Sequence, residues 1–263
     1  MPNVYSQLIE RIFLDNYKKG VKAFEFAREE IEKAASKIGV AAPKNLGDTI
    51  YSFRYRRPLP KSIVSTAPKG LHWQIEGAGR SRYRFVLTKG SLVLPREDLL
   101  VIKVPDATPE IIAKYALSDE QALLAKVRYN RLVDVFLGIT AYSLQSHLRT
   151  TVKGLGQIEI DELYVGLNRS GAQFIIPIQA KGGKDQLSFV QARQDIACCM
   201  EKFPDIVCRS VSAQFMADDV IAMFEIAADG DEMRIADERH YKLVAADAIT
   251  SKELAGYRKL AKS

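Results

Sequence analysis

Residues 156–199 read GQIEIDELYVGLNRSGAQFIIPIQAKGGKDQLSFVQARQDIACC. Two runs of β-forming residues, 157–167 and 172–181, flank the turn sequence Asn-Arg-Ser-Gly at 168–171. Because Asn and Gly tolerate positive φ angles, this arrangement predicts a β-hairpin. Two glycines end the second run, and Asp185 is a suitable N-cap for the helix that we expect next. The stretch therefore predicts two paired strands followed by a helix.

Polar residues occupy regular positions within these two strands. Side chains alternate between the two faces of a strand. Glu159, Asp161 and Leu163 are therefore expected on one face of the first strand. Gln179 and Lys181 are likewise expected on one face of the second strand. A carboxylate on one strand is thus expected beside an amide and a lysine on its neighbour.

The first strand carries an acid, and the next strand carries Gln-Ala-Lys. This pattern resembles the signature of the PD-(D/E)XK nuclease superfamily, in which an acid is followed by (E/Q)-x-K on the adjacent strand. The acid is Asp161, and the second element is Gln179-Ala180-Lys181. Gln in place of the more usual acid is similar to the variant of Mrr-like restriction enzymes. The resemblance covers about residues 108–228. It implies an α/β (α+β) fold with a restriction-endonuclease-like core in the order αβββαβ.

The resemblance also implies a magnesium ion, and the chemistry of the residues suits one. Phosphodiester hydrolysis needs a nucleophilic water, neutralisation of the phosphate charge and help for the leaving oxygen. Mg²⁺ supplies these functions and prefers oxygen ligands. Asp161 offers a carboxylate, Gln179 an amide oxygen and Ala180 its backbone carbonyl. We expect these three residues to hold the metal.

Three further residues are candidates for catalysis. Lys181 would place a positive charge beside the water and the phosphate, where it stabilises the developing anion. Glu159, two residues before Asp161, is a candidate to replace the negative charge that Gln179 lacks. Gln191 lies on the helix expected behind the strands. The alternative interpretation of Glu159 and Asp161 is a half-buried strand whose charges face solvent.

The composition is that of an ordinary globular protein. Of 263 residues, 47% are hydrophobic and 27% are charged. No apolar run approaches the roughly 18 residues of a membrane span, so we expect no contact with a membrane. The three cysteines lack a metal-binding spacing, which predicts reduced thiols in a cytoplasmic protein. The three histidines are far apart in the sequence, which disfavours a nuclease with a histidine-bound metal.

The positive charge is concentrated in the first part of the chain. Residues 1–105 carry 19 basic and 10 acidic side chains, a net charge of +9, whereas residues 106–263 carry 19 and 22, a net charge of −3. Residues 54–96 alone contain ten basic residues and one acid, Glu76. This asymmetry indicates that the N-terminal part contacts a polyanion.

Residues 1–105 are expected to form a mainly helical, winged-helix-like domain. Two helices are predicted within residues 4–38, the second over 21–38, and a third over 42–57. A hairpin with strands at 71–75 and 83–87 follows. Helices followed by a basic hairpin are typical of a winged helix-turn-helix that binds DNA. The residues expected to contact DNA are Arg54, Arg56, Arg57, Lys61, Arg80, Arg82 and Arg84.

Two prolines and a change in charge sign at 104–109 predict a domain boundary, with a nuclease domain over 106–263. Ser118 and Gln121 form a capping box for a long helix that is expected to reach about Leu148. This helix would be the first element of the αβββαβ core.

We therefore expect a magnesium-dependent endonuclease that cleaves double-stranded DNA, as a sequence-specific restriction enzyme does. Because both strands of a duplex must be cut, a homodimer is expected. One alternative is a structure-selective repair or Holliday-junction-type nuclease. Another is a DNA-binding regulator with an inactive nuclease domain, and a third is an unrelated basic scaffold.

Overall fold

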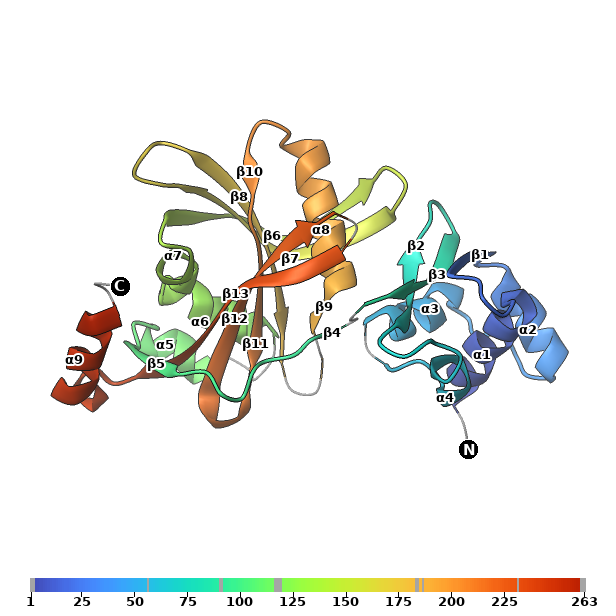
Figure 1. Ribbon diagram of the computed structural model, residues 1–263, viewed down its shortest axis with the longest axis horizontal. Coiled ribbons are helices and arrows are strands. Elements are labelled where there is room, and N and C mark those ends of the chain that lie inside the picture. Colours follow the sequence, from blue (N-terminus) through green and yellow to red (C-terminus); the bar gives the residue numbers. More distant parts are fainter. Residues whose placement is uncertain are drawn as a thin grey trace.

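The computed structural model describes residues 3–55, 57–89, 92–115, 120–182, 185, 187–230 and 232–260. The protein has a mixed α/β fold with a central mixed sheet. Figure 1 shows two units side by side: a smaller N-terminal unit, residues 3–89, and a larger C-terminal unit, residues 92–260. No helix in these residues is long and apolar enough to cross a membrane.

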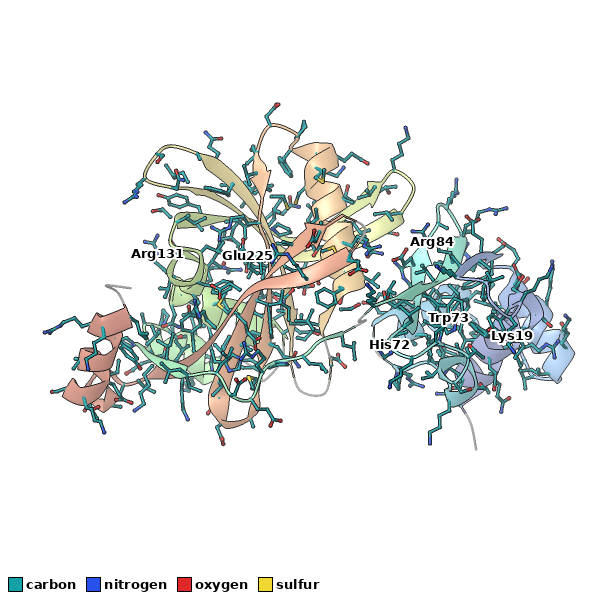
Figure 2. The ribbon with its side chains drawn as sticks, viewed as in Figure 1. Lys19, His72, Trp73, Arg84, Arg131 and Glu225 are labelled. Carbon is teal, nitrogen blue, oxygen red and sulfur yellow. The ribbon has the colours of Figure 1, made fainter. Side chains whose placement is uncertain are left out.

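The N-terminal unit packs four helices against a three-stranded antiparallel sheet of order β1-β3-β2. Its elements are α1 (Val4–Asn16), β1 (Ala23–Ala27), α2 (Glu30–Ile38), α3 (Leu46–Tyr55), α4 (Lys61–Val64), β2 (His72–Gly77) and β3 (Arg82–Thr88). The core is aromatic: the Phe13 ring centroid lies 5.0 Å from that of Phe85 and 5.3 Å from that of Trp73. Trp73 lies inside this unit in Figure 2.

The helix predicted over 21–38 is wrong in its first part, because residues 23–27 form strand β1. β1 pairs with β3, and Phe24 stacks on its cross-strand partner Phe85 with ring centroids 5.2 Å apart. Sheet pairing and aromatic packing override the helical spacing that the sequence suggested. Helix α2 begins only at Glu30, whose carboxylate accepts a hydrogen bond from the backbone N–H of Ala27. The third helix is also shorter than expected, since α3 begins at Leu46.

The C-terminal unit is built on an eight-stranded sheet of order β5-β13-β12-β11-β8-β7-β6, with β10 also paired to β8. The β8–β11, β8–β10 and β5–β13 pairs are parallel and the others antiparallel. Its strands are β4 (Leu92–Val93), β5 (Val101–Pro105), β6 (Thr140–Val152), β7 (Gly156–Leu167), β8 (Gln173–Lys181), β9 (Leu187–Ser188), β10 (Val207–Cys208), β11 (Ser210–Phe215), β12 (Val220–Asp229) and β13 (Glu232–Val244). Its helices are α5 (Glu110–Tyr115), α6 (Glu120–Tyr129), α7 (Leu132–Leu137), α8 (Phe189–Lys202), α9 (Ser251–Leu260) and the 3₁₀ turns Ala217–Asp219 and Ala246–Ala248.

Helices cover both faces of this sheet around β8 (Figure 1). Ile176, Ile178 and Ala180 share a core cluster with buried side chains of α6 and α7. Ile175, whose side chain points to the opposite face of β8, packs with Cys199 of α8. Because successive side chains point to opposite faces, α6 and α7 lie on one side of β8 and α8 lies on the other.

The long helix predicted from Ser118 to Leu148 is interrupted after Tyr129, resumes as α7 and is wrong beyond Leu137. Arg131 and Gly138 adopt left-handed φ angles of 50° and 65°, which end α6 and α7 in turn. Residues 140–152 then form strand β6, paired with β7 along its length. This segment is rich in Thr, Tyr and Ser, which favour strands or turns over helix interiors. Ser118, the expected cap, lies outside the described residues.

The hairpin predicted from the sequence is confirmed as β7 and β8. The Asn168 side chain accepts hydrogen bonds from the backbone N–H groups of Ser170 and Ala172, which fix the turn. The helix that follows is capped by Ser188, which accepts from the N–H of Val190 at 3.1 Å, and not by Asp185. Strand β4 pairs with β9, and strand β5 pairs with β13. Both strands therefore belong to the C-terminal unit, although the sequence placed them before the predicted domain boundary at 104–109.

The two units meet at the end of β2. Buried Glu76 binds Arg84 of β3 at 2.6 Å and lies 3.7 Å from the Arg193 guanidinium of α8. At the next residue, a Cβ added to Gly77 would overlap the carbonyl oxygen of Leu155 in the turn between β6 and β7. The backbone approach at Gly77 therefore sets how closely the units pack.

Substituting Gly77→Ala should separate the units at this junction, because the methyl group has no room beside Leu155. We expect the free energy of unfolding to fall by about 1–3 kcal/mol, as for other overpacked sites, and the radius of gyration measured by X-ray scattering to rise. Gly256→Ala in α9 is the control, since nothing lies within 4 Å of its added Cβ. Unchanged stability and scattering of the Gly77→Ala protein would contradict this account of the junction.

Candidate active site between the two units

A cavity of about 1290 Å³ lies between the two units. The N-terminal unit contributes α3 and the β2–β3 turn, and the C-terminal unit contributes β6, β7, the end of β8, and the first residues of α6 and α8. Polar and charged side chains of both units line it, among them Arg54, Arg80, Glu120, His147, Arg149, Glu159, Asp161, Lys181 and Gln191. The structure thus brings most of the expected catalytic residues and two of the expected DNA-binding arginines into one space.

Asp161 lies where β7 parts from β8. The two strands pair from Leu167↔Gln173 to Glu162↔Ile178, whereas β8 continues to Lys181 paired with β11 on its other side. At the point of separation, the backbone N–H of Ala180 donates to Oδ2 of Asp161 at 2.9 Å. The carboxylate therefore accepts the hydrogen bond that a backbone carbonyl of a paired strand would otherwise accept. This bond fixes the carboxylate at the edge of the cavity.

Strict alternation along β7 is interrupted at this point. Ile158 and Ile160 pack with Cys198 of α8, and Leu163 packs with Cys199 of the same helix. The expectation that Leu163 shares a face with Glu159 and Asp161 is therefore wrong. The separation of β7 from β8 accounts for it, because a strand that leaves its neighbour no longer keeps a regular pleat.

Burial raises the pKa of Asp161 above its ordinary value, although Lys181 and the Ala180 N–H act in the opposite direction. Desolvation penalises the charged form of a carboxylate. A cation bound beside Asp161 would offset that penalty.

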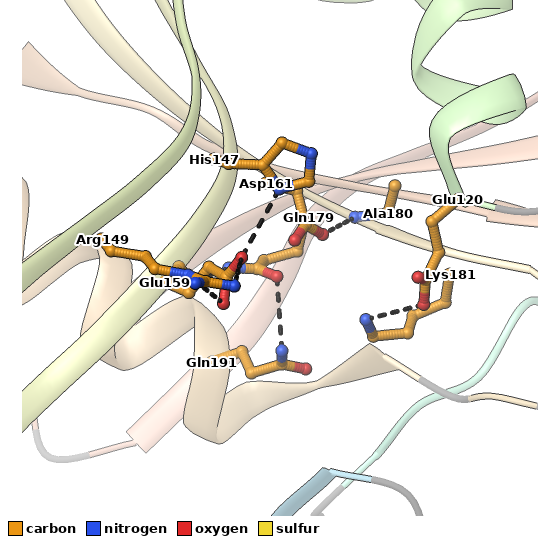
Figure 3. A network of polar contacts seen from close by, with 9 residues as sticks. All are labelled: Glu120, His147, Arg149, Glu159, Asp161, Gln179, Ala180, Lys181 and Gln191. Carbon is orange, nitrogen blue, oxygen red and sulfur yellow. Dashed lines mark hydrogen bonds and ion pairs between the residues drawn. The ribbon is translucent and has the colours of Figure 1, made fainter.

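The ammonium group of Lys181 donates to Oε1 of Glu120 at 3.1 Å (Figure 3). Lys181 is largely buried, and Glu120 begins α6. Sequence reasoning missed Glu120, because it is 61 residues from Lys181 in the chain and no local pattern distinguishes it. The pair holds the lysine at the end of β8, at the wall of the cavity.

Gln179 is buried and connects three elements. Its Nε2 donates to the carbonyl of Glu159 at 3.0 Å and to Oδ1 of Asp195 in α8 at 3.2 Å. Its Oε1 accepts from Nε2 of Gln191 at 3.3 Å (Figure 3). Burial raises the pKa of Asp195 well above its usual range. These contacts orient the Gln179 amide with its nitrogen on the α8 side and its oxygen toward Gln191, which lines the cavity.

The Glu159 carboxylate is engaged by two side chains of β6. His147 Nδ1 lies 3.4 Å from Oε1, and Arg149 Nε lies 3.2 Å from Oε2 (Figure 3). Both residues fall in the segment that the sequence analysis assigned to a helix, so this cluster was not foreseen. Glu159 is directed to these two side chains and not to Asp161, the expected metal ligand.

Within the described residues there is no group of three or more His, Cys, Asp or Glu side chains that could hold a metal ion. The expected donors are instead a carboxylate, an amide oxygen and a backbone carbonyl, from Asp161, Gln179 and Ala180. All are hard oxygen ligands, which suit magnesium that retains several waters. The half-buried carboxylate of Asp161, whose pKa is raised by desolvation, also favours a nearby cation. By donor type these residues fit a magnesium ion, although only Asp161 lines the cavity, and Gln179 and Ala180 are buried behind its wall.

The arginines expected to bind DNA divide into two groups. Arg54 and Arg80 line the cavity. Arg84 donates to Glu76 through Nε at 2.9 Å and through a terminal nitrogen at 2.6 Å, an arrangement that uses its guanidinium inside the protein. Arg82 makes a surface ion pair with Glu25 at 3.2 Å.

The other basic candidates lie elsewhere. Arg57 and Lys61 are exposed and are not part of the cavity wall. Arg56 lies outside the described residues. The lysines and arginines of the described cavity wall come from both units. They are Arg28, Arg54 and Arg80 of the N-terminal unit and Arg149, Lys153 and Lys181 of the C-terminal unit.

No family model, curated protein or solved structure matches this chain. The interpretation of the site therefore depends on its geometry and chemistry.

Arg84→Ala should destabilise the fold, because it removes the short ion pair of buried Glu76, whose contact to Arg193 is longer. We expect a loss of about 1–3 kcal/mol in the free energy of unfolding, measured by urea denaturation. Arg82→Ala, two residues earlier on β3, is the matched control; its exposed ion pair should contribute less than about 1 kcal/mol. Equal stabilities of the two variants would show that Arg84 has no structural role.

Proposed function

We propose that the protein is a magnesium-dependent endonuclease that cleaves double-stranded DNA in the cavity between its two units. The observation that carries the proposal is the meeting of Asp161 and Lys181 at the wall of this cavity. They lie on neighbouring strands of one sheet, and the N–H of the intervening Ala180 holds the carboxylate. The facing wall carries arginines of a unit whose sequence has a net positive charge.

We further propose that the C-terminal unit has a PD-(D/E)XK core and that the N-terminal unit is a winged-helix-like DNA reader. The order α6–α7, β6, β7, β8, α8, β11 supports the first assignment, because it follows the αβββαβ order that the sequence resemblance implied. Helices followed by the β2–β3 hairpin support the second. Helix α3 and the β2–β3 turn both line the cavity, as elements that contact DNA near the cleaved bond would.

In the proposed reaction, Asp161, the Ala180 carbonyl and the Gln179 amide oxygen would hold the metal. When bound, magnesium acts as a Lewis acid and neutralises charge on the phosphate. Lys181, held by Glu120, stabilises the negative charge that develops on the phosphate oxygens. Asp195 acts through Gln179, whose amide it orients. Each of these roles depends on groups placed before the substrate arrives.

The substrate must also be positioned. Arg54 and Arg80 bind phosphates of the duplex, and α3 reads base edges in a groove. One chain carries one such site, and two-fold symmetric DNA is cut on both strands most directly by a homodimer with two sites. The proposal is therefore a restriction-type endonuclease that acts as a dimer.

Lys181→Ala tests this proposal. The substitution should lower the cleavage rate of a duplex by about 10²–10³-fold, as for the loss of other groups that stabilise transition-state charge. DNA affinity, measured without metal, should stay within a few-fold, because the interaction forms mainly in the transition state. Lys202→Ala at the exposed end of α8 removes the same charge away from the cavity and should alter neither quantity. Cleavage by Lys181→Ala at the wild-type rate would refute the assignment.

A further inference from the structure

We propose that His147 is the general base of the cleavage reaction and that Glu159 orients its imidazole. This inference rests on the proposed function and adds a catalytic residue to the same site. It follows from three observations: the position of His147 in β6, its backbone conformation and its contact with Glu159.

His147 is the cross-strand neighbour of Asp161. The β6–β7 register pairs Ser146 with Glu162 and Leu148 with Ile160, which places residue 147 opposite residue 161. His147 also lines the same cavity as Asp161 and Lys181, and Figure 3 shows its imidazole beside the polar network. The side chain is therefore next to the expected position of the reacting phosphate.

The backbone of His147 is strained. Its φ angle is +50°, a region that costs a residue with a Cβ about 1–2 kcal/mol. The other described non-glycine residues with positive φ, which are Ser81, Arg131, Asp218 and Asp219, lie in turns or 3₁₀ segments, whereas His147 lies within a 13-residue strand. Strain of this kind persists at functional sites, where it directs a side chain. Here it directs the imidazole to the cavity wall.

Glu159 gives the imidazole a defined orientation. Its Oε1 lies 3.4 Å from Nδ1 of His147 and also accepts from a terminal nitrogen of Arg149 at 3.4 Å, while Nε of Arg149 lies 3.2 Å from Oε2. A carboxylate beside Nδ1 favours the tautomer with hydrogen on that nitrogen, and the lone pair is then on Nε2. No contact of Nε2 with another described residue competes for that lone pair. The pair Glu159–His147 thus has the parts of a carboxylate-oriented base.

The neighbouring groups are poorly suited to this task. Lys181 donates a hydrogen bond to Glu120 through Nζ. Gln179 and Gln191 are amides and accept no proton. Asp161 already accepts the N–H of Ala180 and is the expected ligand of the cation.

His147 is also distinct from the other two histidines. His72 is exposed on β2, and His240 is buried and lies 2.9 Å from Glu238. Neither belongs to the cavity wall. An imidazole is the side chain that most readily accepts and returns a proton near neutral pH. Among the described residues of the wall, His147 supplies it.

In the proposed step, His147 accepts a proton from the attacking water. The oxygen of a water molecule attacks phosphorus, and one of its protons passes to Nε2 of His147. The bond from phosphorus to the leaving sugar oxygen breaks, and that oxygen takes a proton from solvent. Nε2 then returns its proton to solvent, so one water is consumed and no oxidant or reductant is needed.

His147→Gly with added imidazole tests the inference, because glycine accepts a φ of +50° and leaves space for the free base. The variant should cleave duplex DNA about 10²–10⁴-fold more slowly than the wild type, with metal-free DNA affinity within a few-fold. Free imidazole should restore part of the rate. His72→Gly, also in a strand, is the matched control and should cleave normally with or without imidazole. His147→Asn should be slow and respond less to imidazole, because its side chain occupies the space.

The outcomes separate this inference from the proposed function. If the wild type cleaves no DNA with magnesium, the proposed function is wrong. If the wild type cleaves and His147→Gly cleaves equally fast, the nuclease assignment stands and the role of His147 is overturned. A slow His147→Gly protein that imidazole does not accelerate also overturns the general-base role. Rescue of His147→Gly, without a comparable response from His147→Asn, supports it.

Discussion

The hydrogen bond from the Ala180 N–H to the Asp161 carboxylate is the interaction on which the site depends. It forms where β7 leaves β8, so a side chain occupies the place of a missing sheet bond. Because β8 continues to Lys181 along β11, the lysine remains fixed while β7 diverges. The separation opens a gap between β7 and β8, and the cavity between the units lies over it. One local departure from regular pairing thus positions both proposed catalytic groups.

The charges around this gap neutralise one another in the free protein. Lys181 is paired with Glu120, and Glu159 is paired with Arg149. Such pairing lowers the cost of holding charged groups partly out of water. A phosphate entering the cavity would compete with Glu120 and Glu159 for these cations, and a magnesium ion would compensate the carboxylates released. Binding of the proposed magnesium ion and binding of the proposed DNA substrate would therefore favour each other.

The junction between the units explains why the cavity exists without DNA. Glu76, with Arg84 and Arg193, joins the sheet of the N-terminal unit to α8, and Gly77 allows the backbone of Leu155 to approach. The β2–β3 hairpin therefore serves as a contact between units as well as a wall of the cavity. This dual use accounts for the different roles of Arg80 and Arg84, which the sequence placed in a single basic cluster.

The sequence predicted the hairpin and the meeting of Asp161 with Lys181 because both depend on local rules: turn residues and two-residue alternation. It failed at residues 23–27, whose strand partner β3 lies far along the chain, and at residues 140–152, which pair with the next strand, β7, although their apolar spacing fits a helix. His147 and Arg149 were missed for that reason, and Glu120 was missed because only the fold brings it to Lys181. Leu163 shows the same limit, since alternation cannot reveal where two strands separate.

Incubating the purified wild-type protein with supercoiled plasmid DNA, with magnesium or with EDTA, tests the central claim most directly. The account predicts linear products with defined ends in magnesium and intact plasmid in EDTA. Plasmid that the protein binds but leaves uncut in magnesium, at every protein concentration and over a range of DNA sequences, would contradict it.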